Sequence, residues 1–423
     1  MRPEQIRGDF PFFEGADAPV YLDSAATAQK PKAVLERMTH FYAYENANIH
    51  RGGYALAEHA TRSYEAARAC AAEWIGARPE QTAFTLNATD ALNIACAMIA
   101  KKRLARGCNV VTTALEHNSA FLPWAAACRE KGAELRVLPL DAQGIPEISR
   151  LETLTDRNTV AAVITAGANS TGWNAPLDEM MRFFRGRGVP VVVDATQRVP
   201  HDRLNFNGLG CDFLCFSGHK LYGPLGVGVM AMRKEWAEEG YGRLGGGMVE
   251  EATEKGFVRA KGVQGLEAGT PPVAEAIGLQ AAIEYLQSHT PEECWRNERA
   301  LADALRSGLA EIPGVRVLAA GENSLPVVAF YSERIHPVDL AQMLQMRGIA
   351  LRCGKHCAHV AHERMGLDAT LRASIGIYNT QEDVDALLTS MREIMRRWEK
   401  RYGRCKIEGI CAGGGAACAG ERP

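Results

Sequence analysis

Between about residues 60 and 235, short apolar runs alternate with helix-length amphipathic stretches, and this alternation limits the fold more than any other feature. Seven runs of strand length recur there: Thr82–Leu86, Asn109–Ala114, Glu134–Leu138, Val160–Thr165, Val189–Asp194, Phe213–Phe216 and Val227–Met232. Most are apolar on both faces, which is typical of parallel strands covered by helices on each side. Helical periodicity over Tyr64–Ile75 and Leu177–Arg187 supplies such helices. The pattern predicts an α/β fold with a mostly parallel seven-stranded sheet between helices.

A second pattern begins near residue 290. Helical stretches over Pro272–Ser288 and Pro291–Leu309 are followed by short strands separated by Pro and Gly, and Glu382–Tyr402 carries an apolar stripe of helical period. The predicted strands are Val315–Leu318, Val327–Tyr331, Ile349–Cys353 and Thr370–Tyr378. We therefore predict a large domain over residues 21–275 and a smaller α+β domain over 276–402. Residues 1–20 are expected to pack on the small domain, and 403–423 to form a flexible tail rich in Cys and Gly.

Charge and hydropathy exclude two classes of partner. With 48 Lys and Arg against 50 Asp and Glu, the formal net charge is -2, which gives the chain no bulk attraction to nucleic acid or to an anionic membrane. No apolar run reaches the roughly 18 to 20 residues that span a bilayer, and the first residues show no secretory signal pattern. We expect a cytoplasmic protein with no nucleic-acid or membrane partner.

One lysine stands where a reactive amine is expected. In the segment CDFLCFSGHKLYGP, an apolar strand runs into a turn that holds Lys220. Ligands of open α/β sheets bind at the carboxyl ends of the strands, and a desolvated lysine there can react with an aldehyde. An isolated lysine of this kind is usually only a surface loop residue. Here, however, Asp194 ends another apolar strand, and a lysine with an aspartate for a pyridinium nitrogen suits pyridoxal phosphate (PLP).

A PLP site also needs a phosphate cradle. Thr89 follows the first predicted strand at the start of a helix, where a hydroxyl and free N–H groups can bind an anion. The alternative is that Thr89 simply caps the helix.

Ten segments together give the chain a family resemblance. They are YLDSAATAQKP, NIHRGG, NATDALN, LEHNSAFLPW, ANSTG, DATQ, FSGHKLYGP, EAGTP, RCGKHCA and RASIGIYNT, and they occur in that order between residues 21 and 380. In these motifs, and from about Tyr21 to Trp398 as a whole, the chain resembles the class V aminotransferase superfamily of fold type I PLP enzymes. Within it, the chain is most similar to the cysteine desulfurases of the sulfur-mobilising group II type.

The resemblance implies a role for each matching residue. Lys220 is implied to bind PLP as a Schiff base, Asp194 to pair with the pyridine nitrogen, and Gln197 to lie near the phenolic oxygen. His117 is implied to stack on the ring and transfer protons. The implied phosphate ligands are Thr89, Ser217, His219 and, from the second subunit of a homodimer, Thr270. The implied substrate-binding residues are Asn169, Arg372, His50 and Arg352, with Arg372 gripping the carboxylate.

Cys357 distinguishes the reaction within this superfamily. It lies in RCGKHCAH, where Lys355, His356 and His359 are expected to favour the thiolate. A metal ligand or a packed thiol is the alternative, but no further metal ligands are spaced recognisably, and we assign no metal. The segment matches the loop that carries the persulfide in the family. The resemblance therefore implies a cysteine desulfurase that converts L-cysteine to L-alanine and passes the Cys357 persulfide to an acceptor protein.

Two other readings remain open at this point. One is a different enzyme of the same fold, such as a selenocysteine lyase, an epimerase or a kynureninase-like hydrolase, in which Cys357 is dispensable. The other is a sulfur-carrier or metal-binding protein without activity. The chain also departs from many group II relatives, because Tyr54 stands where they have His and the loop CAHVAH lacks the proline often found after the nucleophile.

The remaining cysteines are mostly predicted to be packing residues. Five lie in apolar contexts: Cys70, Cys96, Cys128, Cys211 and Cys215. Cys353 is close enough to Cys357 to matter, although a buried strand position is the simpler expectation. Cys405, Cys411 and Cys418 lie in the tail, where they are either incidental or able to take sulfur or bind a soft metal.

Overall fold

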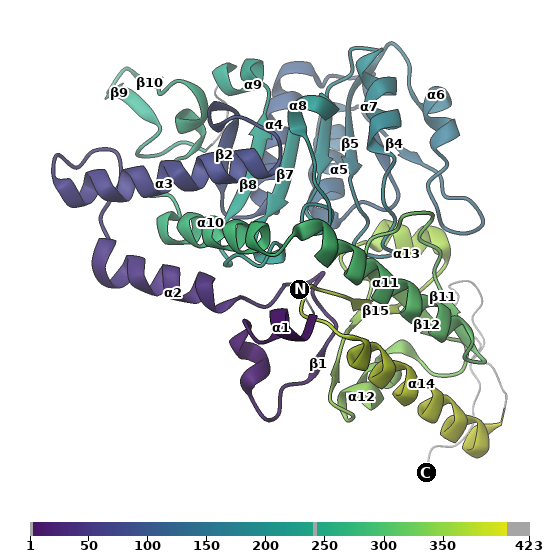
Figure 1. Cartoon of the computed structure of the whole chain (residues 1–423). Helices are drawn as coiled ribbons and strands as arrows, with labels where there is room; N and C mark the ends of the chain where they lie inside the picture. Colours follow the sequence, from purple (N-terminus) through teal and green to yellow (C-terminus); the bar gives the residue numbers. More distant parts are fainter. Residues whose placement is uncertain (1–2, 240–242, 404–423) are drawn as a thin grey trace.

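The computed structural model describes residues 3–239 and 243–403, and its centre is a seven-stranded sheet (Figure 1). The strand order is β2-β8-β7-β6-β5-β3-β4. The bounds are β2 Thr82–Thr85, β3 Asn109–Thr113, β4 Glu134–Leu138, β5 Thr159–Thr165, β6 Val191–Asp194, β7 Phe213–Ser217 and β8 Gly228–Met232. All neighbours from β7 to β4 are parallel, whereas β8 is antiparallel to both β7 and β2. The predicted α/β fold and mostly parallel sheet are confirmed.

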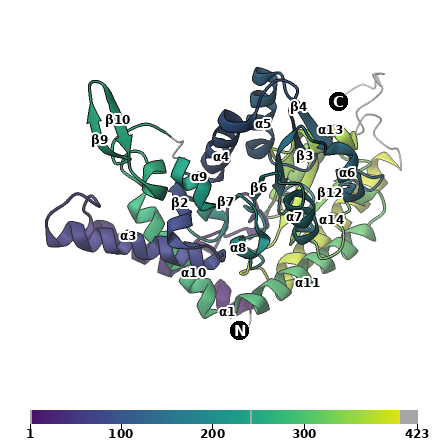
Figure 2. The ribbon, with the colours of Figure 1, turned by 90° about the horizontal axis from the view of Figure 1, so that it is seen from above.

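Helices cover both faces of the sheet, as the doubly apolar strands predict. Figure 2 shows α4 (Ala88–Arg103) and α5 (Asn118–Lys131) on one side and α3 (Ala55–Trp74), α7 (Leu177–Arg185), α8 (Phe206–Leu209) and α10 (Val273–Ser288) on the other. Alternate residues of one strand enter different cores: Val192 belongs to a buried cluster with residues of α4 and α5, while Val191 and Val193 belong to a cluster that includes residues of α3 and α10. The short helices α6 (Leu151–Leu154) and α9 (Lys234–Glu239) lie at the margins of this large unit.

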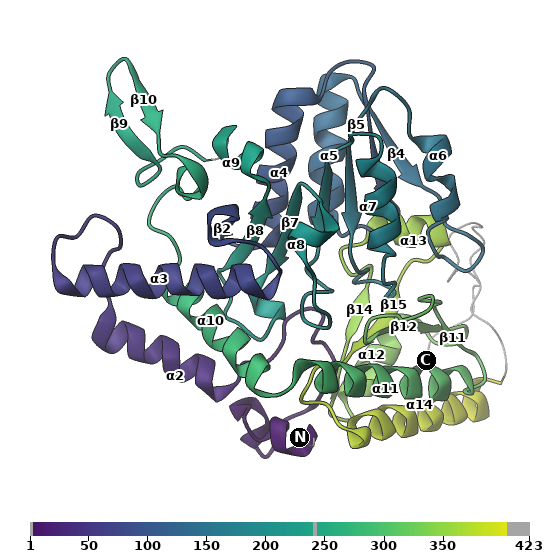
Figure 3. The same ribbon diagram turned by 45° about the horizontal axis from the view of Figure 1, so that its top comes forward.

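A smaller unit follows, built on an antiparallel sheet of order β11-β12-β15-β14 (Figure 3). Its strands are β11 Val315–Val317, β12 Val327–Ser332, β14 Arg352–Gly354 and β15 Thr370–Ser374. The helices α11 (Pro291–Ala310), α12 (Pro337–Gln345), α13 (His359–Met365) and α14 (Gln381–Tyr402) accompany it. Leu305 of α11 and Leu387 of α14 share one buried cluster with Phe330 of β12. The apolar stripe predicted along residues 382–402 therefore faces this core.

The N-terminal segment lies in the seam between the two units. It comprises α1 (Pro3–Arg7), η1 (Pro11–Glu14) and β1 (Val20–Tyr21), and β1 pairs in parallel with β13 (Ile349–Ala350). Arg7 forms an ion pair of 2.9 Å with Asp383 of α14. Phe10 is fully buried among the rings of Tyr222, Tyr285 and Tyr378. The segment thus contacts the large unit as well as the small one, on which residues 1–20 were expected to pack.

Several element limits differ from those expected. The helix predicted from Tyr64 begins at Ala55. Residues 55–63 are helical as well, with Ala57 and Ala60 buried and most of the other side chains exposed. The strand predicted over Ile349–Cys353 is two strands that pair with different partners, β1 and β15. A hairpin of β9 (Val249–Thr253) and β10 (Gly256–Arg259) has no counterpart in the prediction.

The domain limit at residue 275 falls inside α10, and this helix packs on α2 (Lys32–His40) and α3 of the large unit. Nearly all of the predicted tail lies outside the described residues, including its three cysteines. Within the described ranges, no helix is both long and apolar enough to cross a membrane.

Candidate active site

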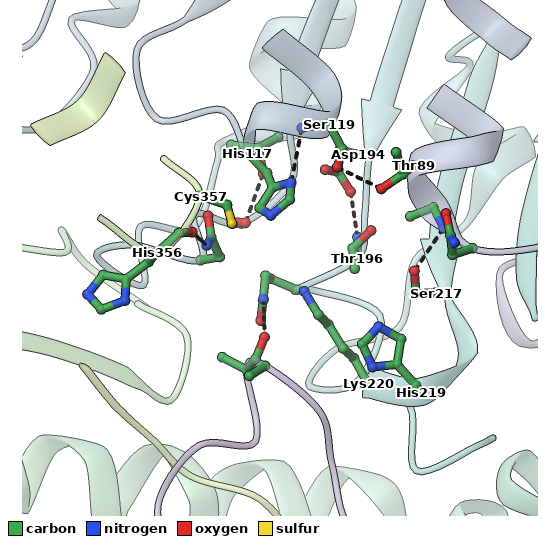
Figure 4. Close-up of a pocket in the computed structure, with 18 of the residues that line it drawn as sticks. Thr89, His117, Ser119, Asp194, Thr196, Ser217, His219, Lys220, His356 and Cys357 are labelled. Carbon is green, nitrogen blue, oxygen red and sulfur yellow. Dashed lines mark hydrogen bonds between the residues drawn. The ribbon is translucent and has the colours of Figure 1, made fainter. Parts of the chain in front are cut away.

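A cavity of about 310 Å³ opens at the carboxyl ends of the central parallel strands. Thr165, Asp194 and Ser217 are the last residues of β5, β6 and β7, and all three line it. The small unit closes the opposite side through Arg352, Cys357 and Arg372. Parallel strands leave their carboxyl ends at one edge of the sheet, where ligands of this architecture bind. Figure 4 shows the side chains that converge there.

Lys220 is the amine of this cavity. It ends the 3-10 turn η5 (Gly218–Lys220), which follows β7 directly. Burial, together with the charge of Arg372, lowers the pKa of Lys220 to about 8, and Asp194 opposes that shift. Asp194 is 4% exposed, and its Oδ1 accepts a 3.0 Å hydrogen bond from the backbone N–H of Thr196. A substantial fraction of Lys220 is therefore neutral, and nucleophilic, in mildly alkaline solution.

The amino end of α4 forms a second wall. Asn87 caps this helix by accepting a hydrogen bond of 3.0 Å from the N–H of Asp90, so the alternative of Thr89 as the cap is wrong. Thr89 Oγ1 is instead 2.7 Å from Ser119 Oγ. Ser217 Oγ accepts from the backbone N–H of Ala88 at 2.8 Å, which leaves the hydroxyl hydrogen of Ser217 available to an anion.

His117 and His219 enter the cavity as neutral imidazoles. Burial and the nearby Lys220 lower the pKa of each to about 4. His117 caps α5, and its Nδ1 accepts from the N–H of Ser119 at 3.1 Å, so Nε2 carries the ring hydrogen. Nδ1 of His219 is buried and has no hydrogen-bond partner among the described residues. Gln197, also in the cavity wall, donates from Nε2 to the carbonyl of Ala25 at 2.8 Å.

Cys357 is exposed at the mouth of the cavity, on a loop with unusual backbone geometry. His356 and Cys357 have φ values of 50° and 54°, and consecutive left-handed residues other than Gly are uncommon. The loop is held from outside. The backbone N–H of Asn118 donates to the carbonyl of Cys357 at 2.7 Å, and the Asn169 amide donates to the carbonyl of His356. Such strain is retained only where neighbouring contacts enforce it.

The charged neighbours of Cys357 are not those expected. His356 is buried, with Nε2 2.9 Å from Thr370 Oγ1, and burial and Arg372 lower its pKa to about 2. Figure 4 shows its ring turned away from the cavity, so the expectation that His356 provides a cation for the thiolate is wrong. A negative charge on Cys357 raises the pKa of Arg352, Arg372 and Lys220, so these three cations face the thiol.

These two arginines lie side by side. Arg352 of β14 is directly opposite Arg372 of β15 in the antiparallel register. Arg372 is 2% exposed and donates from Nη1 to the backbone carbonyl of Asn169 at 3.0 Å. Its Nε has no partner among the described residues and remains available. The structure thus brings three predicted substrate-binding residues together at one end of the cavity.

His50 and Thr270 are the predicted site residues that lie elsewhere. Both are exposed and line a separate cavity beside β9 and the residues just before α10. Within one chain, His50 and Thr270 therefore do not lie at the cavity that holds Lys220. This placement agrees with the implied role of Thr270 in a second subunit, which stays a prediction.

The aminotransferase class-V family profile matches residues 20–387. The chain belongs to the aminotransferase class-V family. Cysteine desulfurase CsdA of Escherichia coli strain K12 is 38% identical over 394 residues, covering 92% of this chain and 97% of that protein. The crystal structure of E. coli CsdA in an S-sulfonic acid form has a TM-score of 0.87 and 36% identity, and the match covers 94% of this chain and 99% of that one.

A further relative is longer than this chain. A probable cysteine desulfurase of Mycolicibacterium paratuberculosis is 36% identical over 394 residues, which are 92% of this chain but 58% of the relative. The predicted family and cofactor are confirmed, since the aminotransferase class-V family is PLP-dependent.

The cavity fits PLP by its own chemistry. An aldehyde needs a neutral amine, and the lowered pKa of Lys220 supplies one. A phosphate needs hydrogen-bond donors, and Ser217, Thr89 and His219, whose Nδ1 has no partner among the described residues, line this cavity together with the amino end of α4. A pyridinium nitrogen needs a buried carboxylate, which is Asp194. Among the described residues, no group of three or more His, Cys, Asp or Glu side chains is arranged to hold a metal ion.

Some residues of the site were not singled out from the sequence. Asp23 and Asn118 lie within the family motifs, but the resemblance implies no role for them, and Glu116 is buried next to His117 with its pKa raised to about 8 by burial. The sequence holds a partial signal for two of these residues. Asp23 is an acidic residue within an otherwise apolar strand end, and Glu116 precedes His117 in the same motif. Apart from Thr113, which is three residues from Glu116, their partners are distant in sequence and therefore not predictable.

Proposed function

We propose that this protein is a PLP-dependent cysteine desulfurase in which Cys357 takes the sulfur atom from L-cysteine and holds it as a persulfide. The observation that carries the proposal is the convergence of an exposed Cys357 with the amine Lys220 and the arginine pair on one cavity. The similarity to proteins named cysteine desulfurases supports the same activity.

Different residues would bind different parts of the cofactor and the substrate. Lys220 would hold the cofactor covalently, Asp194 would keep its ring nitrogen protonated, and the wall at the start of α4 would bind its phosphate. Once bound, PLP supplies an electron sink for the α-carbon of the substrate. Arg372 would take the substrate carboxylate, because it is a buried guanidinium that lines the cavity and its Nε has no partner among the described residues.

Lys220 and His117 would serve the proton transfer in their neutral forms. The free amine of Lys220 would be the base that accepts the proton from the α-carbon of the substrate. His117 is neutral, because burial lowers its pKa to about 4, and its Nε2 is the ring atom that faces away from the Ser119 contact. With its hydrogen on Nε2, it would donate a hydrogen bond at the reacting centre without carrying a net charge there.

The transfer of sulfur to Cys357 needs no external oxidant. The Sγ of Cys357 forms a bond to the substrate sulfur as the Cβ–S bond of the substrate breaks. The electron pair of that broken bond remains with the carbon skeleton, which is protonated and leaves as alanine. Cys357 thiol and L-cysteine thus give Cys357 persulfide and L-alanine. Because Cys357 is exposed, the thiol of an acceptor protein can reach the persulfide.

The test is to add L-cysteine to the purified PLP-loaded protein and locate new persulfide by mass spectrometry of peptides. We expect a mass increase of one sulfur atom on the peptide that holds Cys357, together with alanine. Cys357→Ser should lose the persulfide while it still binds PLP, and Lys220→Ala should lose both products. Wild-type alanine production by Cys357→Ser would contradict the role of the thiol.

Cys96→Ser is the matched control. Cys96 is a buried thiol of α4 outside the cavity, and burial raises its pKa to about 12. The substitution Cys96→Ser should therefore leave persulfide formation unchanged.

A further inference from the structure

Two buried histidines near Cys357 share one hydroxyl, that of Thr370. Thr370 begins β15, two residues before Arg372, and is fully buried. Nε2 of His356, the residue before Cys357, lies 2.9 Å from Thr370 Oγ1. Nε2 of His362, in α13, lies 3.2 Å from the same oxygen. The segments before and after Cys357 are thus joined at a single buried atom.

His362 also contacts the residue that follows Cys357. Its Nδ1 lies 3.1 Å from the carbonyl oxygen of Ala358. A carbonyl oxygen can only accept, so Nδ1 carries the ring hydrogen. Burial lowers the pKa of His362, and the ring is therefore neutral, with no hydrogen on Nε2. Thr370 must then donate its hydroxyl hydrogen to that nitrogen.

The same direction of donation continues through Thr370 to His356. Because the one hydroxyl hydrogen of Thr370 goes to His362, Thr370 Oγ1 accepts from the Nε2–H of His356. Burial lowers the pKa of His356 to about 2, so its Nδ1 has no hydrogen, and this atom is buried with no partner among the described residues. Each hydrogen bond from His356 to the Ala358 carbonyl therefore has an assigned donor.

These bonds hold a backbone that is strained. His356 and Cys357 have φ values of 50° and 54°, a conformation that costs free energy in residues other than Gly. The N–H of Ala358 donates to the carbonyl of Lys355 at 2.8 Å, which closes the chain into a tight turn around Cys357. Figure 4 shows the His356 ring on the side of this loop away from the cavity. The hydrogen bonds therefore hold the loop from behind, where they do not touch the substrate.

We propose that Thr370 is a positioning residue for sulfur transfer: its hydroxyl, through His356 and His362, fixes both flanks of Cys357 and keeps the thiol at the cavity. Thr370 and Arg372 belong to the same strand, so the element that places the substrate-binding guanidinium also places the nucleophile. The carboxylate and the sulfur of the substrate have a limited range of separations, and a common strand holds their two partners at a matching separation. This inference rests on the proposed function, which supplies the substrate.

The experiment measures persulfide formation on Cys357 in a single turnover of the PLP-loaded protein, quenched at a series of times and L-cysteine concentrations. Thr370→Val keeps the shape of the side chain and loses the hydroxyl. We expect its maximal rate to fall about 30-fold, because two buried hydrogen bonds are lost. The L-cysteine concentration that gives half the maximal rate should stay at the wild-type value, because Arg372 is unchanged.

Thr370→Ser restores the hydroxyl without the methyl group, and it should form persulfide at close to the wild-type rate. His362→Phe keeps a ring in the same space and leaves the bond between His356 and Thr370, so its maximal rate should fall about tenfold, less than in Thr370→Val. Thr112→Val is the matched control, because Thr112 of β3 is also fully buried and its hydroxyl has no partner among the described residues. This control should change neither the maximal rate nor the half-saturating concentration.

The outcomes separate the two claims. If the wild type forms no persulfide on Cys357, the proposed function fails. If the wild type is active and Thr370→Val keeps its maximal rate, or Thr370→Ser is as slow as Thr370→Val, the inference about the hydroxyl is overturned. A raised half-saturating concentration with an unchanged maximal rate would place the effect on substrate binding and would also overturn it. Should Thr370→Val fail to fold, His362→Phe decides, and a wild-type maximal rate in that variant overturns the inference.

Discussion

Glu116 is a fully buried acid directly before His117, and it has only neutral hydrogen-bond partners. Its Oε1 accepts from Thr113 Oγ1 and from the backbone N–H of Thr165, each at 2.8 Å. Its Oε2 is buried without a partner among the described residues. Burial therefore raises the pKa of Glu116 from 4.5 to about 8, and the folded protein keeps the carboxyl protonated at neutral pH.

This raised pKa predicts a pH-dependent stability. The stabilising contribution of protonated Glu116 is complete below pH 4.5 and is lost as the pH rises towards 8, because only the unfolded chain ionises freely in that range. Between pH 5.5 and 8.5 the wild type should therefore lose about 3 kcal/mol more free energy of unfolding than Glu116→Gln. Urea unfolding of both proteins without PLP at the two pH values measures this. Equal losses in the two proteins would contradict the raised pKa.

At the scale of elements, helix α5 and the Cys357 loop form one unit. Asn118 begins α5, next to His117, and its side chain Nδ2 is 3.0 Å from His359 Nδ1 of α13. Its backbone N–H holds the carbonyl of Cys357. A helix that places the imidazole of His117 therefore also positions the proposed nucleophile, although the two segments are more than two hundred residues apart in the chain.

Asn118→Ala tests this coupling. The substitution removes the side-chain bond to α13 and leaves the backbone bond in place, so the loop should become less ordered. A lost hydrogen bond of about 1 kcal/mol corresponds to about a fivefold decrease in the rate of persulfide formation. PLP affinity should stay at the wild-type value, and alkylation of Cys357 by iodoacetamide should change in rate. Gln381→Ala, at the exposed start of α14, is the control that should change neither rate.

At the scale of the whole molecule, the separation of the two cavities makes a prediction about assembly. Lys220 lines the first cavity, and Thr270 and His50 line the second. If two chains associate so that the second cavity of one meets the first cavity of the other, Thr270 serves the Lys220 of its partner. Each complete site would then need both chains.

Mixed dimers of Lys220→Ala chains and Thr270→Val chains test that arrangement. In a dimer with one chain of each kind, the intact Lys220 is in the Thr270→Val chain. Its site contains an unchanged Thr270 only if the Thr270 of the other chain acts across the interface. We expect its PLP affinity to equal that of the wild type, whereas dimers of two Thr270→Val chains should bind PLP about tenfold more weakly, because a hydrogen bond to a charged phosphate is lost. Weak binding in the mixed dimer would place Thr270 in its own chain's site.

The sequence by itself determined the fold class, the cofactor and the main reactive groups. Doubly apolar strands, the strand-to-turn segment around Lys220 and the acid that ends β6 are local patterns, and each carries its chemistry within a few residues. Only the tertiary structure decided what depends on contacts between distant segments. Asp23 and Arg372 are 349 positions apart, yet they form one ion pair. Burial likewise made His356 neutral and Glu116 protonated, since the pKa of a side chain follows the residues packed around it.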